Sequence, residues 1–298
     1  MSFTREPVDS ATAGPVDGGR AGEKGPTPGP RRPGRWRQLS SISLPPVVLG
    51  VAIVGVWYFI SYGVLEERRR FLLRPPHQVI KVGFLEWDNF SEILEAMWSS
   101  TRVALIGLVI SIVLGFVVAI VMSQAKVAER AIFPYMVTLQ AIPILALVPL
   151  IGFWFGYGRT SRVFVCVIIS IFPIIVNTLF GLQSAERGMH DLFTLHHANR
   201  LTRLRKLMFP AALPAVFAGL RISAGLSVIG AVVGDFFFGQ GEAGIGQLLK
   251  KYAVQLDGEQ LLASVIMTAL LGVVVFWTFG WLQTRVIGKW HESTSGGT

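Results

Sequence analysis

The 298-residue sequence is poor in charged residues and in cysteine, and both shortages limit what the chain can be. Charged residues make up 15%, whereas a soluble domain typically carries about 25%. The hydrophobic share is 52%, and the mean hydropathy is +0.55. This composition excludes a disordered chain and a cytosolic enzyme. The single cysteine, Cys166, lies in an apolar run, so the chain holds no disulfide framework and no cysteine-based metal site.

The motifs of catalysis and nucleotide binding are also missing. No apolar run carries paired carboxylates or a nucleophile elbow. The glycine-rich segment 230–246 lacks the GK[ST] of a phosphate-binding loop, so we expect no ATP on this chain. His190, His196 and His197 lie near Asp191, but neighbouring side chains on a helix diverge by about 100° and cannot easily share an ion. We therefore expect no catalytic residue, no metal and no cofactor bound by this chain.

Long apolar runs dominate what is present. A helix needs about 20 mostly apolar residues to cross a membrane, and such a helix satisfies its own backbone polar groups. We therefore expect an all-α membrane protein with about six transmembrane helices. The expected spans are residues 46–65, 102–124, 132–155, 163–183, 212–235 and 260–283. Pro143 and Pro149 predict a kink or break in the third span, and Pro173 predicts one in the fourth.

The regions outside the spans complete the predicted domain organisation. Residues 45–290 form the transmembrane domain. Residues 1–44, rich in Gly, Pro, Ser and Arg, are predicted to be a disordered basic tail, and residues 291–298 a short second tail. For residues 88–100 two interpretations stay open: an amphipathic helix on the outer lipid surface, or an extension of the second span.

The placement of basic residues predicts the orientation. With the N-terminus inside, the cytoplasmic segments hold 16 Lys and Arg residues and the outer segments hold 9. This bias favours a multi-pass protein with both termini in the cytoplasm. The net charge of +9 then reflects topology, and we expect no nucleic-acid partner.

The segment His190–Pro214 is the most informative part of the chain. Apolar residues recur there every three or four positions, and four basic residues occupy the other positions. The apolar positions are Leu192, Leu195, Ala198, Leu201, Leu204 and Met208. Such a helical element needs a partner for its apolar stripe, and we favour a protein groove over the lipid surface.

This segment and the following AALPAVFAGLRISAGLSVIGAVVGDFF resemble the coupling region of permease subunits of bacterial ATP-binding-cassette importers. The similar branch handles nitrate, sulfonates, taurine and thiamine precursors. FLLRPPHQVI, QAIPILALVPLIGFWFGYG and a last span ending near Lys289-Trp290 agree with it. The resemblance covers roughly residues 45–290.

The resemblance implies an importer-type permease bundle in the bacterial plasma membrane that works by alternating access. A small solute of the sulfonate, nitrate or thiamine-precursor kind would be delivered by an extracytoplasmic binding protein. The implied partners are ATPase subunits that hold ATP and Mg, a second permease copy in a homodimer, and membrane lipid.

The resemblance also implies a set of residues that couple to the ATPase. The Glu-Ala-Ala, glycine and Leu-Pro of the family correspond to Asp191-Leu192-Phe193, His197 and Phe209-Pro210. His197 is a departure, because histidine adopts a positive φ only occasionally. The implied coupling residues are Asp191, Leu192, Phe193, Leu195, His197, Ala198, Leu201, Leu204 and Pro210.

A few polar groups in the spans are further candidates. Asn177, Asp235 and the neighbouring Phe236 are candidate pathway residues. Arg221 is predicted to have a structural role, by snorkelling or pairing near the cytoplasmic end of its span. The alternative function is an ion-coupled secondary transporter, or a membrane scaffold, without an ATPase. Such a transporter needs ionisable groups deep in its spans, where Arg221 is almost alone.

Overall fold

The computed structural model describes the backbone of residues 35–287 and the side chains of residues 45–287. No strand occurs in this range, which confirms the predicted all-α class. The helices are α1 (Arg35–Phe59), α2 (Pro76–Ile80), α3 (Trp87–Gln124), α4 (Lys126–Ala141), α5 (Ile144–Phe155), α6 (Arg159–Gln183), α7 (Arg187–Leu195), α8 (Arg200–Arg203), α9 (Phe209–Phe237), α10 (Ile245–Gln255) and α11 (Gly258–Ile287). Short π or 3-10 turns occupy residues 60–64, 67–69, 81–85 and 204–208.

Helix α1 contains the boundary between two compact units, at Ile53 and Val54. The expected tail 1–44 lies outside the described residues as far as residue 34, but its last ten residues are helical. Glycine and proline, the strongest helix breakers, occur before Arg35 and not in residues 35–44, which accounts for the earlier start. The expected second tail, residues 291–298, lies outside the described residues.

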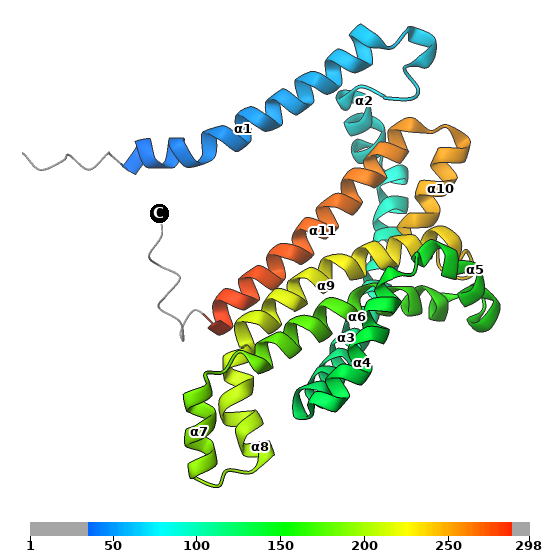
Figure 1. The fold of residues 1–298 in the computed structure, drawn as a ribbon. Helices are drawn as coiled ribbons and strands as arrows, with labels where there is room; N and C mark the ends of the chain where they lie inside the picture. The colour runs from blue at the N-terminus through cyan, green and yellow to red at the C-terminus, as the bar shows by residue number, and fades with distance from the viewer. Residues whose placement is uncertain (1–34, 288–298) are drawn as a thin grey trace, which may run out of the picture. The chain divides into compact units, whose positions relative to one another are not determined.

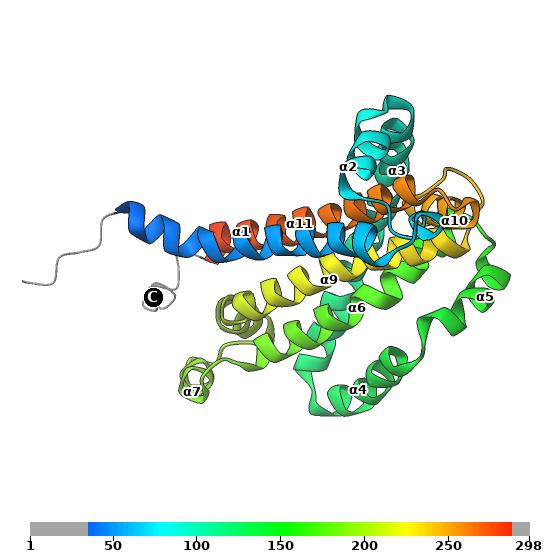
Figure 2. The ribbon, with the colours of Figure 1, turned by 90° about the horizontal axis from the view of Figure 1, so that it is seen from above.

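The second unit is built around α6 and α9. These helices run side by side, α3 packs against both, and α11 follows α9 (Figures 1 and 2). Their buried faces form the core clusters, such as the one around Cys166 that contains Val103, Ala104, Val228 and Ala231. Helices α7 and α8 lie at one end of the α6–α9 pair, and α10 lies at the other (Figure 1).

Small residues set the close approach of these helices. A Cβ placed on Gly107 of α3 would lie 2.4 Å from the Cys166 Cβ, and one on Gly230 of α9 would lie 2.8 Å from the Cys166 Cα. A Cβ on Gly219 would lie 2.9 Å from the Pro173 carbonyl oxygen of α6. Backbones therefore pack at distances that larger side chains would prevent, as the small-residue repeats of membrane helices allow.

The segment expected as the third span, residues 132–155, differs from a single helix. It contains α4 and α5, which meet at an angle of 98°. Pro143 has no backbone N–H to donate, and it holds the preceding Ile142 in the extended region with ψ 125°. The chain therefore turns at Ile142–Pro143, whereas α5 continues through Pro149 and α6 through Pro173.

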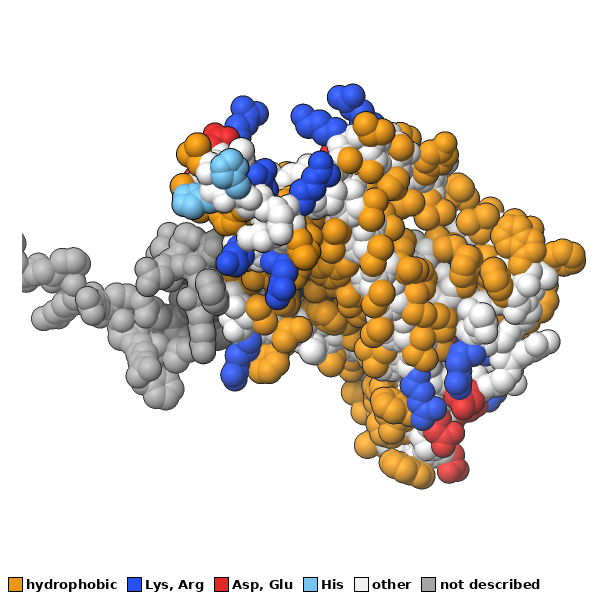
Figure 3. Space-filling view, turned by 90° about the horizontal axis from the view of Figure 1, so that it is seen from below, with side chains coloured by type: hydrophobic (Ala, Val, Ile, Leu, Met, Phe, Trp, Pro, Cys, Tyr) orange, Lys and Arg blue, Asp and Glu red, His pale blue; other side chains and the backbone are white. Residues whose placement is uncertain are grey.

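Helix α3 is continuous over 38 residues. Residues 88–100 form its first turns, so the extension of the second span is the correct interpretation of that segment. Five described segments are long and apolar enough to cross a membrane, and the α4–α5 pair adds a sixth if it counts as one span. This agrees with the prediction of about six transmembrane helices. Figure 3 shows a hydrophobic belt between two ends that carry the charged side chains.

Replacing Gly230 with alanine tests the close helix packing. The added methyl group meets the α6 backbone, and such overpacking typically costs about 1–3 kcal/mol. We expect Gly230→Ala to lower the thermal unfolding midpoint of the purified protein in detergent. Gly225→Ala is the matched control, because a Cβ there meets no atom within 4 Å. Equal midpoints for the two variants would contradict the packing argument.

Candidate functional site

The structure places the candidate residues at two ends and in the middle of the α6–α9 pair. The first group forms the α7–α8 element, which is a helix, a turn and a short helix. Asn199 starts α8, because its side-chain oxygen accepts a hydrogen bond of 2.7 Å from the Thr202 N–H. The Arg203 Nη2 atom donates to the Thr194 hydroxyl at 2.8 Å and thereby ties α8 back to α7.

His197 makes the turn between these helices in a left-handed conformation, with φ +49°. The N–H of Ala198 donates to the Phe193 carbonyl at 3.0 Å, and the N–H of His197 donates to the Thr194 carbonyl at the same distance. These bonds close the C-terminus of α7 in the manner usually made by a glycine. The turn implied by the family glycine is thus kept, although a histidine occupies the position.

The leucines of the α7–α8 element divide into two groups. Leu192, Leu195 and Leu201 are exposed, and Leu195 is 77% exposed. We call these three residues the coupling face, after the role that the resemblance to importer permeases implies for them. Leu204 instead packs inward, against the core cluster of Leu182, Met208, Ala212 and Val216. Leu204 was predicted to lie on the same apolar stripe as the exposed leucines, but in the structure it is half-buried at the start of the π turn 204–208.

The remaining predicted coupling residues lie around this face. Asp191 is exposed on α7. Phe193 and Ala198 are half-buried, and a backbone hydrogen bond joins them across the turn after α7. Pro210 is exposed in the first turn of α9, directly after the π turn 204–208.

The opposite end of the α6–α9 pair contains a buried ion pair. Arg162 of α6 is 1% exposed, and its Nη1 atom lies 3.3 Å from an oxygen of Asp235 of α9, which is fully buried. The same guanidinium donates to three carbonyl oxygens of the α9–α10 loop, those of Phe238 at 3.0 Å, Gln240 at 3.0 Å and Glu242 at 2.9 Å. Arg162 therefore holds the whole loop against α6. We call this group the outer interlock, after the side of the membrane on which the predicted topology places it.

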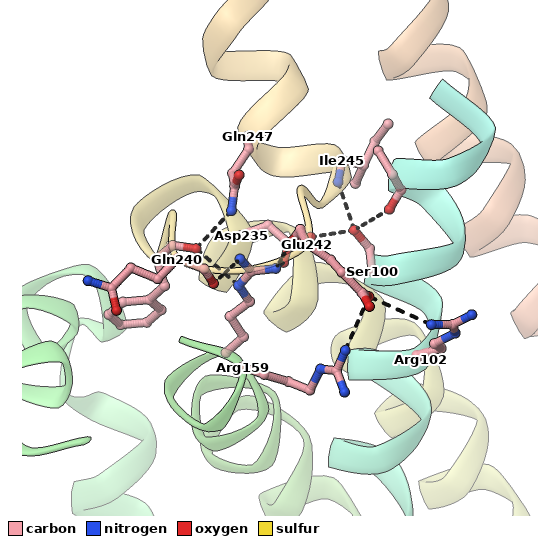
Figure 4. Close-up of polar contacts among 11 residues, drawn as sticks. Ser100, Arg102, Arg159, Asp235, Gln240, Glu242, Ile245 and Gln247 are labelled. Carbon is pink, nitrogen blue, oxygen red and sulfur yellow. Dashed lines mark hydrogen bonds and ion pairs between the residues drawn. The ribbon is translucent and has the colours of Figure 1, made fainter. Parts of the chain in front are cut away.

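Asp235 connects the outer interlock to α3 and α10. Its second oxygen accepts a hydrogen bond from the Ser100 hydroxyl of α3, which in turn accepts one from the Ile245 N–H at 2.8 Å (Figure 4). Gly244 and Gly246 pass so close that a Cβ on either would lie less than 3.0 Å from Asp235. The backbone of the glycine-rich segment thus packs closely around the Asp235 carboxylate.

The rim around this interlock carries exposed ion pairs. Glu242 lies 3.1 Å from Arg159 and 3.6 Å from Arg102 (Figure 4). Glu92 of α3 accepts from both Lys251 at 2.6 Å and the Tyr252 hydroxyl at 2.8 Å. Burial and the neighbouring Glu92 carboxylate raise the pKa of Tyr252 above its ordinary value, so its hydroxyl stays protonated and keeps donating.

The predicted pathway residues do not come together. Asp235 belongs to the outer interlock and is fully buried. Phe236 is 40% exposed and contacts Phe237 and the Lys250 ammonium. Asn177 donates to the Pro173 carbonyl at 2.8 Å and packs beneath Gly219, which is a helix-packing role. Arg221 lies between α9 and α11, over the Phe276 ring.

Arg162 is the functional candidate that the sequence prediction missed. It directly precedes the uncharged run that defines the fourth span, so the prediction from sequence places it outside the span and not among the polar groups within it. The available signal was the opposite charge of Asp235 at the same end of another span. Two opposite charges at matching depth in neighbouring spans are expected to pair.

Removing the Arg162 guanidinium tests the outer interlock. Loss of one partner of a buried ion pair typically costs about 3–5 kcal/mol, because the other charge stays buried. We expect Arg162→Gln to lower the thermal unfolding midpoint strongly. Arg159→Gln removes a 57% exposed guanidinium three residues away and should cost less than about 1 kcal/mol. Similar unfolding midpoints for both variants would show that the buried Arg162–Asp235 pair contributes no more to stability than an exposed ion pair.

Replacing His197 with glycine tests the strain in the turn. A non-glycine residue pays roughly 1–2 kcal/mol in the left-handed region, so His197→Gly should slow amide hydrogen exchange at the end of α7. His196→Gly is the control, because φ is −83° there and glycine gains nothing. Faster exchange in His197→Gly than in the parent would contradict the assigned conformation.

Comparisons with known proteins agree with this arrangement. Residues 111–288 match the family described as binding-protein-dependent transport system inner membrane component. The chain is 34% identical to the formylaminopyrimidine transport permease protein ThiX of Halalkalibacterium halodurans, over 78% of this chain and 91% of that protein. It is 24% identical to the putative aliphatic sulfonates transport permease protein SsuC of Bacillus subtilis, over 89% and 93% of the two chains.

A solved structure shares the fold. The chain superposes on an amino acid ABC transporter, crystallised with histidines, with a TM-score of 0.53 and 18% sequence identity. The match covers 70% of this chain and 99% of the other. With the family match and the ThiX similarity, this settles the class: the chain belongs to the binding-protein-dependent inner membrane components and is a permease subunit of an ATP-binding-cassette importer, not an enzyme.

Proposed function

We propose that two copies of this chain form the pathway of a bacterial importer, and that the coupling face docks on an ATPase subunit that binds ATP and Mg. The observation that carries the proposal is the α7–α8 element. It is internally fixed by the Asn199 cap, the His197 turn and the Arg203–Thr194 hydrogen bond, yet it exposes three leucines. A rigid element with an exposed apolar face is suited to transmit force from a partner.

Orientation follows from this docking. The α7–α8 end faces the cytoplasm, where ATP is available, and the outer interlock faces the opposite side, where a binding protein delivers the solute. Both termini then lie in the cytoplasm of a cell with the chain in its plasma membrane. The excess of basic residues in the segments on the α7–α8 side supports this orientation.

A second copy of the chain is supported by the α4–α5 pair. Ile142 and Pro143, where the helix breaks, are exposed in the single chain. Broken helices are tolerated at membrane depth only where protein or a water-filled cavity covers the freed backbone groups. Lipid does not meet that requirement, so we propose that a second copy or the pathway between the copies covers this break.

The proposed solute is small and of the kind carried by similar permeases. ThiX is named for formylaminopyrimidine and SsuC for aliphatic sulfonates. We propose a thiamine-precursor-like heterocycle, a sulfonate or a similar small oxygen-rich solute such as nitrate. An ion-coupled transporter or scaffold without an ATPase is disfavoured by the family match.

Charged substitutions in the coupling face test the proposal. Burying one leucine is worth about 1.5–3 kcal/mol, so placing an aspartate at such a site should weaken docking at least tenfold. We expect the double variant Leu195→Asp, Leu201→Asp to lose the ATPase subunit and its ATP hydrolysis when the tagged chain is purified from its native membranes.

The control is Val127→Asp at the start of α4. Val127 is as exposed as Leu195 and lies on the same side of the membrane in the proposed topology, but outside the α7–α8 element. It should retain the ATPase. A double variant that co-purifies with as much ATPase activity as Val127→Asp would overturn the assignment of the coupling face.

A further inference from the structure

Arg221 lies near the middle of its membrane span. It is 15 residues from Lys206 and 14 residues from Asp235, which mark the two ends. At 1.5 Å per residue, its Cα is about 21–23 Å from each along the helix axis. The predicted role by snorkelling toward the cytoplasmic end therefore does not fit, because an arginine side chain is far shorter than that distance.

The guanidinium of Arg221 has an aromatic neighbour but no counter-charge among the described residues. Its Cζ lies 3.6 Å from the centre of the Phe276 ring of α11, which is a close cation–π contact. Its Nε atom is buried without a hydrogen-bond partner in the described part of the chain. None of the ion pairs between residues 45 and 287 includes it.

This guanidinium contributes to the wall of a groove between α9 and α11. The groove has a volume of about 950 Å³, and Arg221 is the one charged residue among those that line it. Gly225 and Gly272 leave its floor open, since a Cβ on either meets no atom within 4 Å. Thr268 also lines it, but its hydroxyl already donates to the Ser264 carbonyl at 2.7 Å.

A lipid-facing groove is a poor explanation for these observations. A charged side chain at the centre of a bilayer costs at least about 2.5–3.5 kcal/mol, and such residues almost always face the bundle interior or water. Helix α1 would not neutralise the charge either, because Pro45–Val64 contains no acidic residue. Water and a passing solute would do so, because both present oxygen acceptors to the guanidinium.

We propose that the α9–α11 groove is a wall of the solute pathway, and that Arg221 binds the solute through its oxygen acceptors. This inference rests on the proposed function, because it assumes that the chain forms a pathway. Phe276 supports one face of the guanidinium and leaves its N–H edges to donate. A guanidinium pairs well with groups that present two oxygen acceptors side by side, so the solute class is one with carboxylate, sulfonate, nitrate or ring-carbonyl oxygens. Cations are repelled.

Cysteine accessibility tests the groove without knowledge of the solute. Gly225→Cys and Gly272→Cys are made separately in the full importer complex, in membrane vesicles open to reagent on both sides. Each is treated with an anionic reagent, sulfonatoethyl methanethiosulfonate, and a cationic one, trimethylammonioethyl methanethiosulfonate. Cys166 is buried, so the parent chain provides the blank. Gly188→Cys in α7, where a Cβ meets open space, is the water-exposed control.

Val113→Cys is the control of matched depth. Val113 is 57% exposed near the middle of α3, and a thiol that faces lipid reacts slowly with charged reagents. We expect both groove cysteines to react much faster than Val113→Cys. We also expect the ratio of anionic to cationic rates at Gly225→Cys to fall about tenfold when Arg221→Gln is added, because one charge at about 6 Å then no longer separates the two reagents.

Three results would overturn the proposal. Groove cysteines that react as slowly as Val113→Cys would place the groove against lipid. A disulfide between Gly272→Cys and Gly55→Cys of α1 would show that the N-terminal helix fills it. If Arg221→Gln leaves the ratio of anionic to cationic reaction rates at Gly225→Cys unchanged, Arg221 does not attract anionic groups into the groove, and its proposed role in solute binding is wrong. Co-purification of the ATPase is measured in parallel for the parent chain and for Arg221→Gln. If the ATPase does not co-purify with the parent chain, the proposed function is contradicted. The accessibility of the cysteines tests only the assignment of the groove.

Discussion

The buried contact of Arg162 with Asp235 is the interaction on which the arrangement of the chain depends. It joins α6 to α9 directly, α3 through Ser100, and α10 through the loop carbonyls that Arg162 also binds. In a low-dielectric interior such a network is stabilising only when nearly every donor and acceptor is used. Here the guanidinium reaches four acceptors, and the carboxylate receives bonds on both oxygens. The helices α3, α6, α9 and α10 are thereby tied together at one end.

The same helix pair connects the interlock to the coupling element. Helices α6 and α9 are continuous between the two ends, and Cys166 packs against Gly230 with no room for a side chain between them. Close packing of this kind resists shear within the pair, so a displacement of α7 and α8 moves α6 and α9 together. A rotation of α7 and α8 would thus be transmitted through α6 and α9, and it would move the α9–α10 loop and the interlock with them. That is the mechanical requirement of alternating access.

The sequence predicted the class and the spans well because both depend on composition and on helical period. It also identified the α7–α8 element, whose apolar spacing is regular from Leu192 to Leu201. Prediction failed where a tertiary contact decides the outcome. Leu204 has the same spacing, but it packs against the core cluster of α6 and α9. Asp235 was a candidate pathway residue because polar groups in spans tend to face a cavity. Its partner Arg162 is 73 positions away in the sequence, and only the packing of α6 on α9 brings the two together. A kink or break at Pro143 was expected from the sequence, but its size of 98° depends on tertiary packing, in which α5 contacts α6 through Phe155 and Phe164.

The scarcity of charge within the spans makes each remaining charge informative. Arg162 and Asp235 neutralise one another and are both buried, so they hold the fold together. Arg221 differs in each of these respects: it is near mid-span, it faces a groove, and its guanidinium rests on an aromatic ring instead of a carboxylate. A chain that already has one way to satisfy a buried arginine gains no stability from a second arginine left without a counter-charge. The proposed role accounts for Arg221, because the transported solute would supply the acceptor that its guanidinium lacks.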